Sequence, residues 1–467
     1  MTTFYIEQFG CRATQADAAA IERQLRDRGF SPAGDSSCAD VVIVNTCTVT
    51  GAADAQARDA IRKLHARNPA ARLIATGCYA QRASEELAAL PGVSWVVGNS
   101  HKPEIPWLMD ATSETAAGRS SNGFVPAGAL GGEKLSLLHG PAKILTGNIF
   151  EQRALLAAPV IGGEGNHTRP VVKIQDGCNS RCAYCVIPFV RGRSRSLQPE
   201  QVIGEIARLS ATGYREIVLS GINLGTYGRD LSPRVELIEL LRRVLDETGV
   251  ERLRISSIEP MDVTEELIAL FASSERLAQH FHMPLQSGCD RVLAAMHRWY
   301  RAEHYARRVE LIRERLPNAA IGADVIAGFP GETDAEHAET LAFIARLPFS
   351  YLHVFSYSMR PGTRAAALTD QVPTQVVKSR ARELRALGER KMKEFRLSQV
   401  GRQLQVLTLR NEQHPADATP AISSNYLQVR VRGKFPSNEW LDVRISRDSE
   451  LAERLCLEEN LPAAVNA

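Results

Sequence analysis

Apolar and polar positions follow two regular patterns in the first hundred residues. Short apolar runs (FYIEQF, VVIVN and RLIAT) predict strands. Stretches with helical periodicity lie between them, near residues 16–28 and 52–67, and another helical stretch follows the third strand. This strand–helix order predicts a small parallel sheet with crossover helices.

The same alternation resumes at Val171 and continues for about two hundred residues. The expected strands are VVKIQ, EIVLS, RLRIS, HFHMP, GADVIA and YLHVF, each separated from the next by a helical pattern. Six parallel strands with crossovers predict an incomplete or complete α/β barrel. Before it, residues 111–165 are rich in Gly, Ala and Ser and are interpreted as a linker.

The pattern changes once more near the end of the chain. A charged helix is expected from Thr374 to about Val400, followed by the short alternating strands QLQVLTLR, NYLQVRVRG and EWLDVRIS, which predict a small β-barrel. The expected fold class is therefore α/β with an added β-barrel. The expected parts are an N-terminal parallel-sheet domain (1–110), a linker (111–165), a (β/α)6-type partial barrel (166–400), a C-terminal β-barrel (401–450) and a tail (451–467).

Composition narrows the class of protein. The chain has 467 residues, of which 44% are hydrophobic and 23% charged, as expected for several folded domains. A net charge of +3 neither requires nor excludes a nucleic-acid partner. The start shows no secretory signal pattern and no apolar run reaches spanning length, so we expect a cytoplasmic protein without a membrane partner. Nine cysteines are too few for a disulfide scaffold, and in a reducing compartment clustered cysteines usually bind metal.

Cys178, Cys182 and Cys185 form a CxxxCxxC motif directly after the first strand of the second domain. Three thiolates with this spacing can bind three irons of a cubane 4Fe–4S cluster and leave the fourth iron open. The open iron can chelate S-adenosylmethionine, and one electron from the cluster would then break a carbon–sulfur bond to give an adenosyl radical. A closed zinc site is the alternative, but it needs four ligands, and no fourth Cys or His follows nearby because His167 precedes the strand.

Cys11, Cys47 and Cys78 each follow the end of a predicted strand. Because the carboxyl ends of parallel strands share one edge of a sheet, the three thiolates are expected to converge and to hold a second, incompletely ligated 4Fe–4S cluster. The alternative is that each is a small buried hydrophobe. Three further cysteines lack partners at ligand spacing and are interpreted as structural: Cys38, Cys289 and Cys456.

Glycines and polar residues follow the other barrel strands at the end where barrel enzymes place their sites. Those expected to contact S-adenosylmethionine are Gly221, Asn223, Glu259, Gln286 and Gly328. For any single polar residue among them, the alternative is a turn or a helix cap.

Basic residues suggest where RNA could bind. Arg191, Arg193 and Arg195 follow the cysteine motif, and Arg430 and Arg432 lie in the tail barrel. We expect them to contact phosphates, with neighbouring aromatic rings stacking on splayed bases; the rings are Tyr426, Phe435 and Trp440. The alternatives are a solvated basic face and a set of rings that fill the small barrel's core.

Together these motifs resemble the radical methylthiotransferases over nearly the whole chain, with an N-terminal cluster domain, a radical SAM barrel and a C-terminal TRAM domain. The resemblance implies two 4Fe–4S clusters and two molecules of S-adenosylmethionine per turnover. One molecule would give a methyl group to sulfur at the N-terminal cluster, and the other would give the radical that removes hydrogen from an adenine ring. The implied partners are a tRNA anticodon stem-loop, an electron donor such as flavodoxin or ferredoxin, and a sulfur donor.

Smaller motifs indicate a branch of that family. NTCTVTGAAD, GCYAQR and SGINLGTYG are similar to the branch that converts N6-threonylcarbamoyladenosine next to the anticodon to its 2-methylthio derivative. The isopentenyladenosine branch typically has Ser-Val-Arg in place of Thr48, Val49 and Thr50, and Met in place of Tyr79. The alternatives are methylthiolation of isopentenyladenosine or of a ribosomal protein, and an iron–sulfur redox sensor that binds RNA without chemistry.

Overall fold

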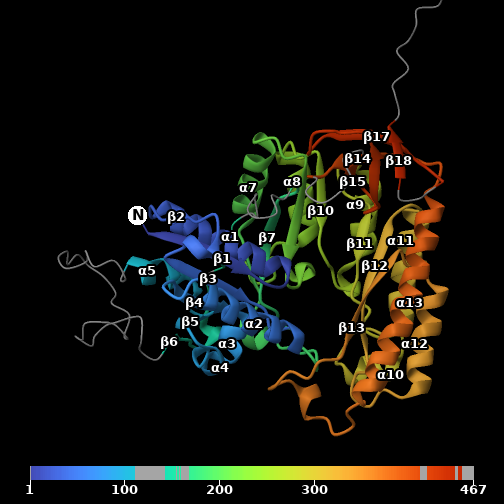
Figure 1. Ribbon diagram of the computed structural model, residues 1–467. Helices are drawn as coiled ribbons and strands as arrows, with labels where there is room; N and C mark the ends of the chain where they lie inside the picture. The colour runs from blue at the N-terminus through green and yellow to red at the C-terminus, as the bar shows by residue number, and fades with distance from the viewer. Residues whose placement is uncertain are drawn as a thin grey trace, which may run out of the picture.

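The chain folds into three parts along its length (Figure 1). This computed structural model describes residues 2–110, 142–153, 155–156, 158, 168–410 and 418–447, and the backbone of 451–454. An N-terminal parallel sheet is followed by a central α/β domain and by a C-terminal β-barrel, so the predicted fold class is confirmed. None of the helices in these ranges has the length and apolar character needed to cross a membrane.

The N-terminal sheet has six parallel strands in the order β2-β1-β3-β4-β5-β6. Its elements are β1 (Thr3–Gln8), α1 (Arg12–Asp27), β2 (Ser31–Pro32), β3 (Val41–Thr46), α2 (Gly51–Arg67), β4 (Arg72–Gly77), α3 (Cys78–Arg82), α4 (Ser84–Ala88), β5 (Val93–Gly98), α5 (Ile105–Asp110) and β6 (Lys143–Leu145). Every residue of β3 is buried, which explains its continuous apolar run. Strand β6 lies inside the stretch expected to be a linker, so residues 143–145 belong to the sheet instead; residues 111–141 lie outside the described ranges.

The central domain contains all six predicted parallel strands. Together with the short strand β8, which pairs antiparallel with β7, they form the sheets β8-β7-β9-β10 and β11-β12-β13. Single bridges (Leu253 to Leu277, Ser257 to His282) join β10 to the segment around β11. The strands are β7 (Val171–Asp176), β8 (Arg195–Ser196), β9 (Glu216–Gly221), β10 (Arg252–Ile255), β11 (His280–His282), β12 (Ala320–Ala327) and β13 (Tyr351–Ser356). The helices are α6 (Ile187–Arg191), α7 (Pro199–Ala211), α8 (Leu237–Glu247), α9 (Glu265–Ser273), α10 (Asp290–Ala295), α11 (Ala302–Arg315), α12 (Asp334–Arg346) and α13 (Thr374–Ser398). One continuous apolar core packs α7 to α13 against the strands, whereas α6 packs in a separate small cluster with Cys78.

Helix α13 leads into a closed barrel with strand order β14-β15-β16-β18-β17. Its strands are β14 (Gln403–Thr408), β15 (Ala418–Ser423), β16 (Gln428–Arg432), β17 (Trp440–Ile445) and β18 (Leu451–Arg454). Alternate residues of β16 and β17 fill the core, as the period of two predicts. Because β18 pairs with both β16 and β17, the barrel takes in the start of the expected tail; residues 455–467, with Cys456, lie outside the described ranges.

Candidate active site between two groups of cysteines

The CxxxCxxC loop lies between β7 and α6. Backbone hydrogen bonds hold it, from Cys178 N to Gly192 O (3.0 Å) and from Cys185 N to Cys182 O (3.1 Å). Burial, followed by the neighbouring Cys182, raises the pKa of Cys185 to about 12, and burial also raises the pKa of Cys182. Such thiols lose their protons readily only when a metal ion takes the proton's place. The loop therefore has the donor chemistry of a metal-cluster site.

Hydrogen-bond donors surround two of these sulfur atoms. Arg298 Nη1 lies 3.3 Å from Cys182 Sγ, while Asn223 Nδ2 and Ser180 N lie 3.8 and 3.4 Å from Cys178 Sγ. Donors of this kind stabilise thiolates and adjust the potential of a cluster bound to them. The surroundings of the loop thus fit three thiolates that share a cluster.

The structure brings the three N-terminal cysteines together at one edge of the sheet. Cys11 precedes α1, Cys47 follows β3, and Cys78 begins α3. Gly10 has a φ of +100°, and a Cβ there would lie 2.5 Å from Cys47 Cβ, so only glycine permits this approach. Burial, then Cys78 and Cys11, raises the pKa of Cys47 to about 12. This group could also hold a metal cluster.

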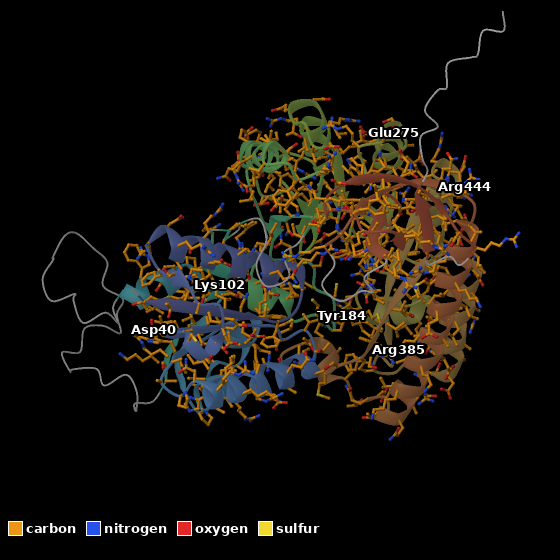
Figure 2. All side chains as sticks on the ribbon, turned by 45° about the horizontal axis from the view of Figure 1, so that its top comes forward. Asp40, Lys102, Tyr184, Glu275, Arg385 and Arg444 are labelled. Carbon is orange, nitrogen blue, oxygen red and sulfur yellow. The ribbon has the colours of Figure 1, made fainter. Side chains whose placement is uncertain are left out.

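Helix α6 separates the two groups of cysteines. Cys78 packs against Val186 and Val190, at the two ends of this short helix. Asn99 links Cys78 to this helix, since its Nδ2 lies 3.5 Å from Cys78 Sγ and 2.7 Å from Val190 O. In Figure 2, Tyr184 of the CxxxCxxC loop lies between the N-terminal domain, in which Lys102 is labelled, and the helical side of the central domain. The two groups therefore face one region of the molecule.

Two further cysteines, Cys38 and Cys289, lie in the described ranges. Cys38 is exposed, and Cys289 is buried among apolar side chains of α10 and its neighbours. This apolar cluster includes Ala183 and Tyr184 of the CxxxCxxC loop. That Cys38 and Cys289 are structural stays a prediction.

Arg191 has a structural role that the sequence prediction did not anticipate. Its side chain is 1% exposed, with Nη2 3.0 Å from Asp17 Oδ2 and Nη1 3.0 Å from both Asp176 oxygens. The prediction that it contacts phosphate is therefore wrong, because two buried carboxylates already occupy its guanidinium. Arg195 is mostly buried and donates to Gln152 O (3.2 Å), whereas Arg193 is exposed.

In the C-terminal barrel, Arg432 is exposed and Arg430 half-buried on β16. Figure 2 places Arg444 on the outer side of the same barrel. The aromatic residues of this barrel do not all lie in its core. Trp440 lies under the Arg252 guanidinium (4.2 Å to the ring centroid) and donates to Glu251 (2.6 Å). Phe435 packs at the edge of the barrel core. These contacts place Trp440 at the junction with the central domain.

A cavity of about 440 Å³ lies beside the CxxxCxxC loop. Two of the five residues expected to contact S-adenosylmethionine, Asn223 and Glu259, line it together with Arg298, which forms an ion pair with Glu259. Gly221 lines a larger cavity next to it. Gln286 and Gly328 line neither of these two cavities. Gln286 N donates to Asp324 O (2.8 Å), and Gly328 N donates to Glu332 (2.8 Å).

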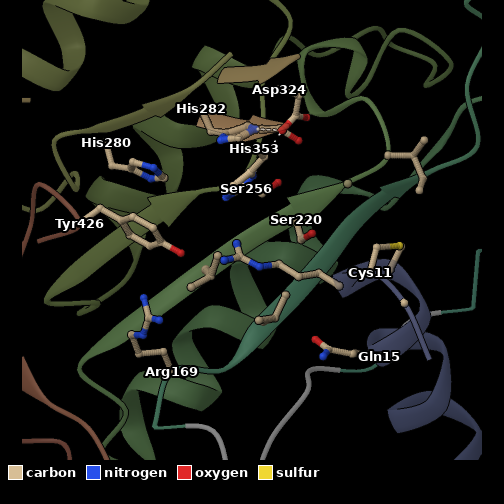
Figure 3. Close-up of a pocket in the computed structure, with 18 of the residues that line it drawn as sticks. Cys11, Gln15, Arg169, Ser220, Ser256, His280, His282, Asp324, His353 and Tyr426 are labelled. Atoms are coloured by element: carbon tan, nitrogen blue, oxygen red, sulfur yellow. Dashed lines mark hydrogen bonds and ion pairs between the residues drawn. The ribbon is translucent and has the colours of Figure 1, made fainter. Parts of the chain in front are cut away.

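The larger cavity, of about 880 Å³, lies where all three parts of the chain meet (Figure 3). Cys11 reaches it from α1, Tyr426 from the C-terminal barrel, and Ser220, His282 and Asp324 from the central strands. The Tyr426 ring stacks on His280, with 4.2 Å between ring centroids and 13° between planes. A planar ligand here would lie between the N-terminal cysteines and the strands of the central domain.

Arginines give this cavity a positive character. Arg12, Arg169 and Arg410 line it, against Asp324 as the one lining carboxylate in the described ranges. Arg169 shares the buried Glu216 with Arg252 and Arg254, so a single carboxylate compensates three guanidinium groups there. Burial and the neighbouring Arg169 and Arg254 lower the pKa of Arg12. A cation behaves in this way when burial and other cations outweigh its negatively charged neighbours.

Sequence reasoning missed several residues of these cavities. Arg12, Arg169 and Arg298 lie in no motif, and nothing near them in the chain indicates their partners. His280 and His282 could have been found, because they occupy alternate positions of a short buried strand, where two polar residues on one face are unusual.

Comparisons with known proteins agree with this architecture. Residues 3–98 match the family described as Uncharacterized protein family UPF0004, and residues 172–344 match the Radical SAM superfamily. A radical SAM domain implies a 4Fe–4S cluster and S-adenosylmethionine. The structure of the radical S-adenosylmethionine methyltransferase TsrM from Kitasatospora setae aligns over 78% of this chain and 77% of its own, with a TM-score of 0.55 and 16% identity, and so supports the fold alone.

Curated relatives with two different names match this chain in sequence. The chain is 36% identical to threonylcarbamoyladenosine tRNA methylthiotransferase MtaB of Aquifex aeolicus, over 91% of this chain and 96% of the relative. It is 33% identical to tRNA-2-methylthio-N(6)-dimethylallyladenosine synthase of Carboxydothermus hydrogenoformans, over 82% of each. These similarities confirm the resemblance seen in the motifs, and the chain belongs to the radical SAM methylthiotransferase family of enzymes.

Proposed function

We propose that this enzyme adds a methylthio group to N6-threonylcarbamoyladenosine next to the anticodon of tRNA. The observation that carries the choice of nucleoside is the arginine lining of the larger cavity, Arg12, Arg169 and Arg410. The threonylcarbamoyl group ends in a carboxylate, which guanidinium groups bind through charge-assisted hydrogen bonds. An isopentenyl group is a hydrocarbon and offers these guanidinium groups no such hydrogen bond. Sequence identity alone does not separate the two nucleosides, since relatives of both names match at similar levels.

The cysteine groups have separate roles in this proposal. Cys178, Cys182 and Cys185 hold one 4Fe–4S cluster, and Cys11, Cys47 and Cys78 hold the second. Bound together, the first cluster and S-adenosylmethionine supply the one-electron cleavage that starts the reaction, and the second cluster holds the sulfur that is transferred. Two molecules of S-adenosylmethionine are used per turnover, with an external electron donor such as flavodoxin or ferredoxin and a sulfur donor.

The residues of the smaller cavity bind the cofactor. Arg298 and Glu259 offer a cation and an anion side by side, which match the carboxylate and the amino group of the methionyl part. Asn223 lies between this cavity and Cys178, and Gly221, two residues earlier, lines the larger one. The segment 221–223 therefore connects the cofactor with the nucleoside. Gln286 and Gly328 follow β11 and β12, and in this proposal they contribute to S-adenosylmethionine binding from the ends of those strands.

The tRNA backbone binds through exposed cations of the central domain and the C-terminal barrel. Arg193 and Arg432 are exposed, and Arg430 lies on the same strand as Arg432. Phosphate contacts of this kind position an RNA without reading its sequence. Tyr426 lies on the wall of the larger cavity.

A direct test uses the reconstituted enzyme with reductant, S-adenosylmethionine and two tRNAs, one with threonylcarbamoyladenosine and one with isopentenyladenosine. We expect the methylthio product only from the first. Arg12→Gln should lower kcat/KM for that tRNA by about ten- to a hundredfold, because a hydrogen bond to a charged group contributes about 1.5–3 kcal/mol. The matched control is Arg307→Gln, an exposed arginine of α11, which should leave it unchanged. Faster modification of the isopentenyl substrate would contradict the proposal.

A further inference from the structure

Three metal-binding side chains meet inside the larger cavity (Figure 3). His282, Asp324 and His353 each bring one ligand atom to the same point, and the three atoms lie within 4.8 Å of one another. His282 Nε2 is 2.9 Å and His353 Nδ1 is 3.3 Å from Asp324 Oδ1. None of these three residues belongs to a cysteine group or to the cofactor residues described above.

We propose that His282, Asp324 and His353 bind a divalent transition-metal ion such as Zn²⁺, with its remaining coordination positions open to the cavity. Two imidazoles and one carboxylate are a ligand set that zinc and iron(II) accept, and sites with three protein ligands keep a position for water or substrate. The site lies where the proposed function puts the modified nucleoside, but its existence does not depend on which nucleoside binds.

The backbone holds the three ligands in a rigid arrangement. They come from the adjacent parallel strands β11, β12 and β13, in which Asp324 is the direct partner of His353 and His282 is the partner of Gly322. Positions 322 and 324 face the same side of β12, since side chains alternate along a strand. The side chains become more exposed from His282 (10%) through Asp324 (24%) to His353 (55%), so the open side faces the cavity.

The surroundings of His282 fix its ring as a metal ligand requires. His282 Nδ1 lies 2.9 Å from the Tyr351 hydroxyl, which lies 2.7 Å from His280 Nε2. When His282 Nδ1–H donates to the tyrosine oxygen and the tyrosine O–H donates to His280, the lone pair of His282 Nε2 points toward Asp324. A metal-bound histidine usually makes such a hydrogen bond through its other nitrogen.

The test is elemental analysis and zinc-edge X-ray absorption of the full chain with both clusters reconstituted, after incubation with Zn²⁺ and removal of free metal. We expect about one zinc ion per chain in a shell of nitrogen and oxygen atoms. His353→Gln and Asp324→Asn should each weaken zinc binding at least tenfold, with iron content and cleavage of S-adenosylmethionine as checks of folding. The matched control is His304→Gln, an exposed histidine of α11, which should bind zinc like the wild type. Absence of zinc, a sulfur-containing shell, or unchanged binding in His353→Gln would overturn the proposal.

Discussion

The carboxylate of Asp17, in helix α1 of the N-terminal sheet domain, lies 3.0 Å from the guanidinium of Arg191, at the end of α6 in the central domain. The same carboxylate pairs with Lys102 (2.8 Å) and with Lys173 of β7. All four side chains are almost completely buried. Because Arg191 follows the CxxxCxxC loop and Asp17 follows Cys11 on the first helix, this network fixes the separation of the two cysteine groups.

Asp17→Asn should destabilise the contact between these domains. It leaves Lys102, Lys173 and Arg191 facing one another with only Asp176 to compensate them. Removing one partner of a buried ion network typically costs about 3–5 kcal/mol. The free energy of unfolding, measured by denaturant titration, should fall by that amount. As a control, Asp59→Asn removes an exposed pair with Arg62 and should change the stability by less than about 1 kcal/mol.

Glu216 should make stability depend on acid pH. Burial opposes its ionisation, but Arg254 and Arg169 outweigh burial and lower its pKa from 4.5 to about 2. A group with a lowered folded-state pKa stabilises fully above its unfolded value, and this stabilisation is lost as the pH falls from 4.5 towards 2. The difference in unfolding free energy between wild type and Glu216→Gln should therefore be constant from pH 5.5 to 8 and shrink below pH 4.5. A difference that grows on acidification would contradict this assignment.

Two single variants should distinguish the roles of the two cysteine groups. Cys182→Ala should abolish the formation of 5′-deoxyadenosine from S-adenosylmethionine, because the first cluster loses a ligand. Cys47→Ala should retain that cleavage but form no methylthio product. Both products can be quantified by mass spectrometry, with Cys38→Ala, an exposed cysteine outside both groups, as the control. Equal loss of cleavage in the first two variants would refute the division of roles.

Arg298 should influence the potential of the first cluster. Its guanidinium is 3% exposed and lies 3.3 Å from Cys182 Sγ. Hydrogen bonds to cluster sulfurs are one of the factors that set reduction potential, and a positive donor favours the reduced, more negative state. In Arg298→Gln we expect a lower potential, measured by redox titration followed by electron paramagnetic resonance. An unchanged potential would mean that the contact is not made in the loaded enzyme.

The sequence was sufficient for three main strands of the N-terminal sheet and for the six parallel strands of the central domain. Strand β3 is a continuous apolar run that is buried along its whole length, as a parallel sheet covered on both faces requires. Cys11, Cys47 and Cys78 converge because they follow strands whose carboxyl ends share one edge of the sheet. Strand β6 could not be predicted, because three residues in a glycine-rich stretch carry no periodicity.

The partners of the charged residues could not be predicted from the sequence, for a different reason. The basic run containing Arg191 has the pattern of a solvated face, and its burial depends on Asp17, 174 positions earlier in the chain. The cationic cavity likewise combines Arg12, Arg169 and Arg410 from three parts of the fold. Long-range pairings of single charged residues leave no local pattern that a sequence could show.

Mass spectrometry of nucleosides from bulk tRNA would identify the substrate, in a strain lacking this gene and in the same strain complemented with wild type or with Arg12→Gln. We expect 2-methylthio-threonylcarbamoyladenosine to disappear in the deletion strain, to return with the wild-type gene and to return only weakly with the variant. Loss of the methylthio-isopentenyl nucleoside instead, with the threonylcarbamoyl form unchanged, would show that threonylcarbamoyladenosine is not the substrate.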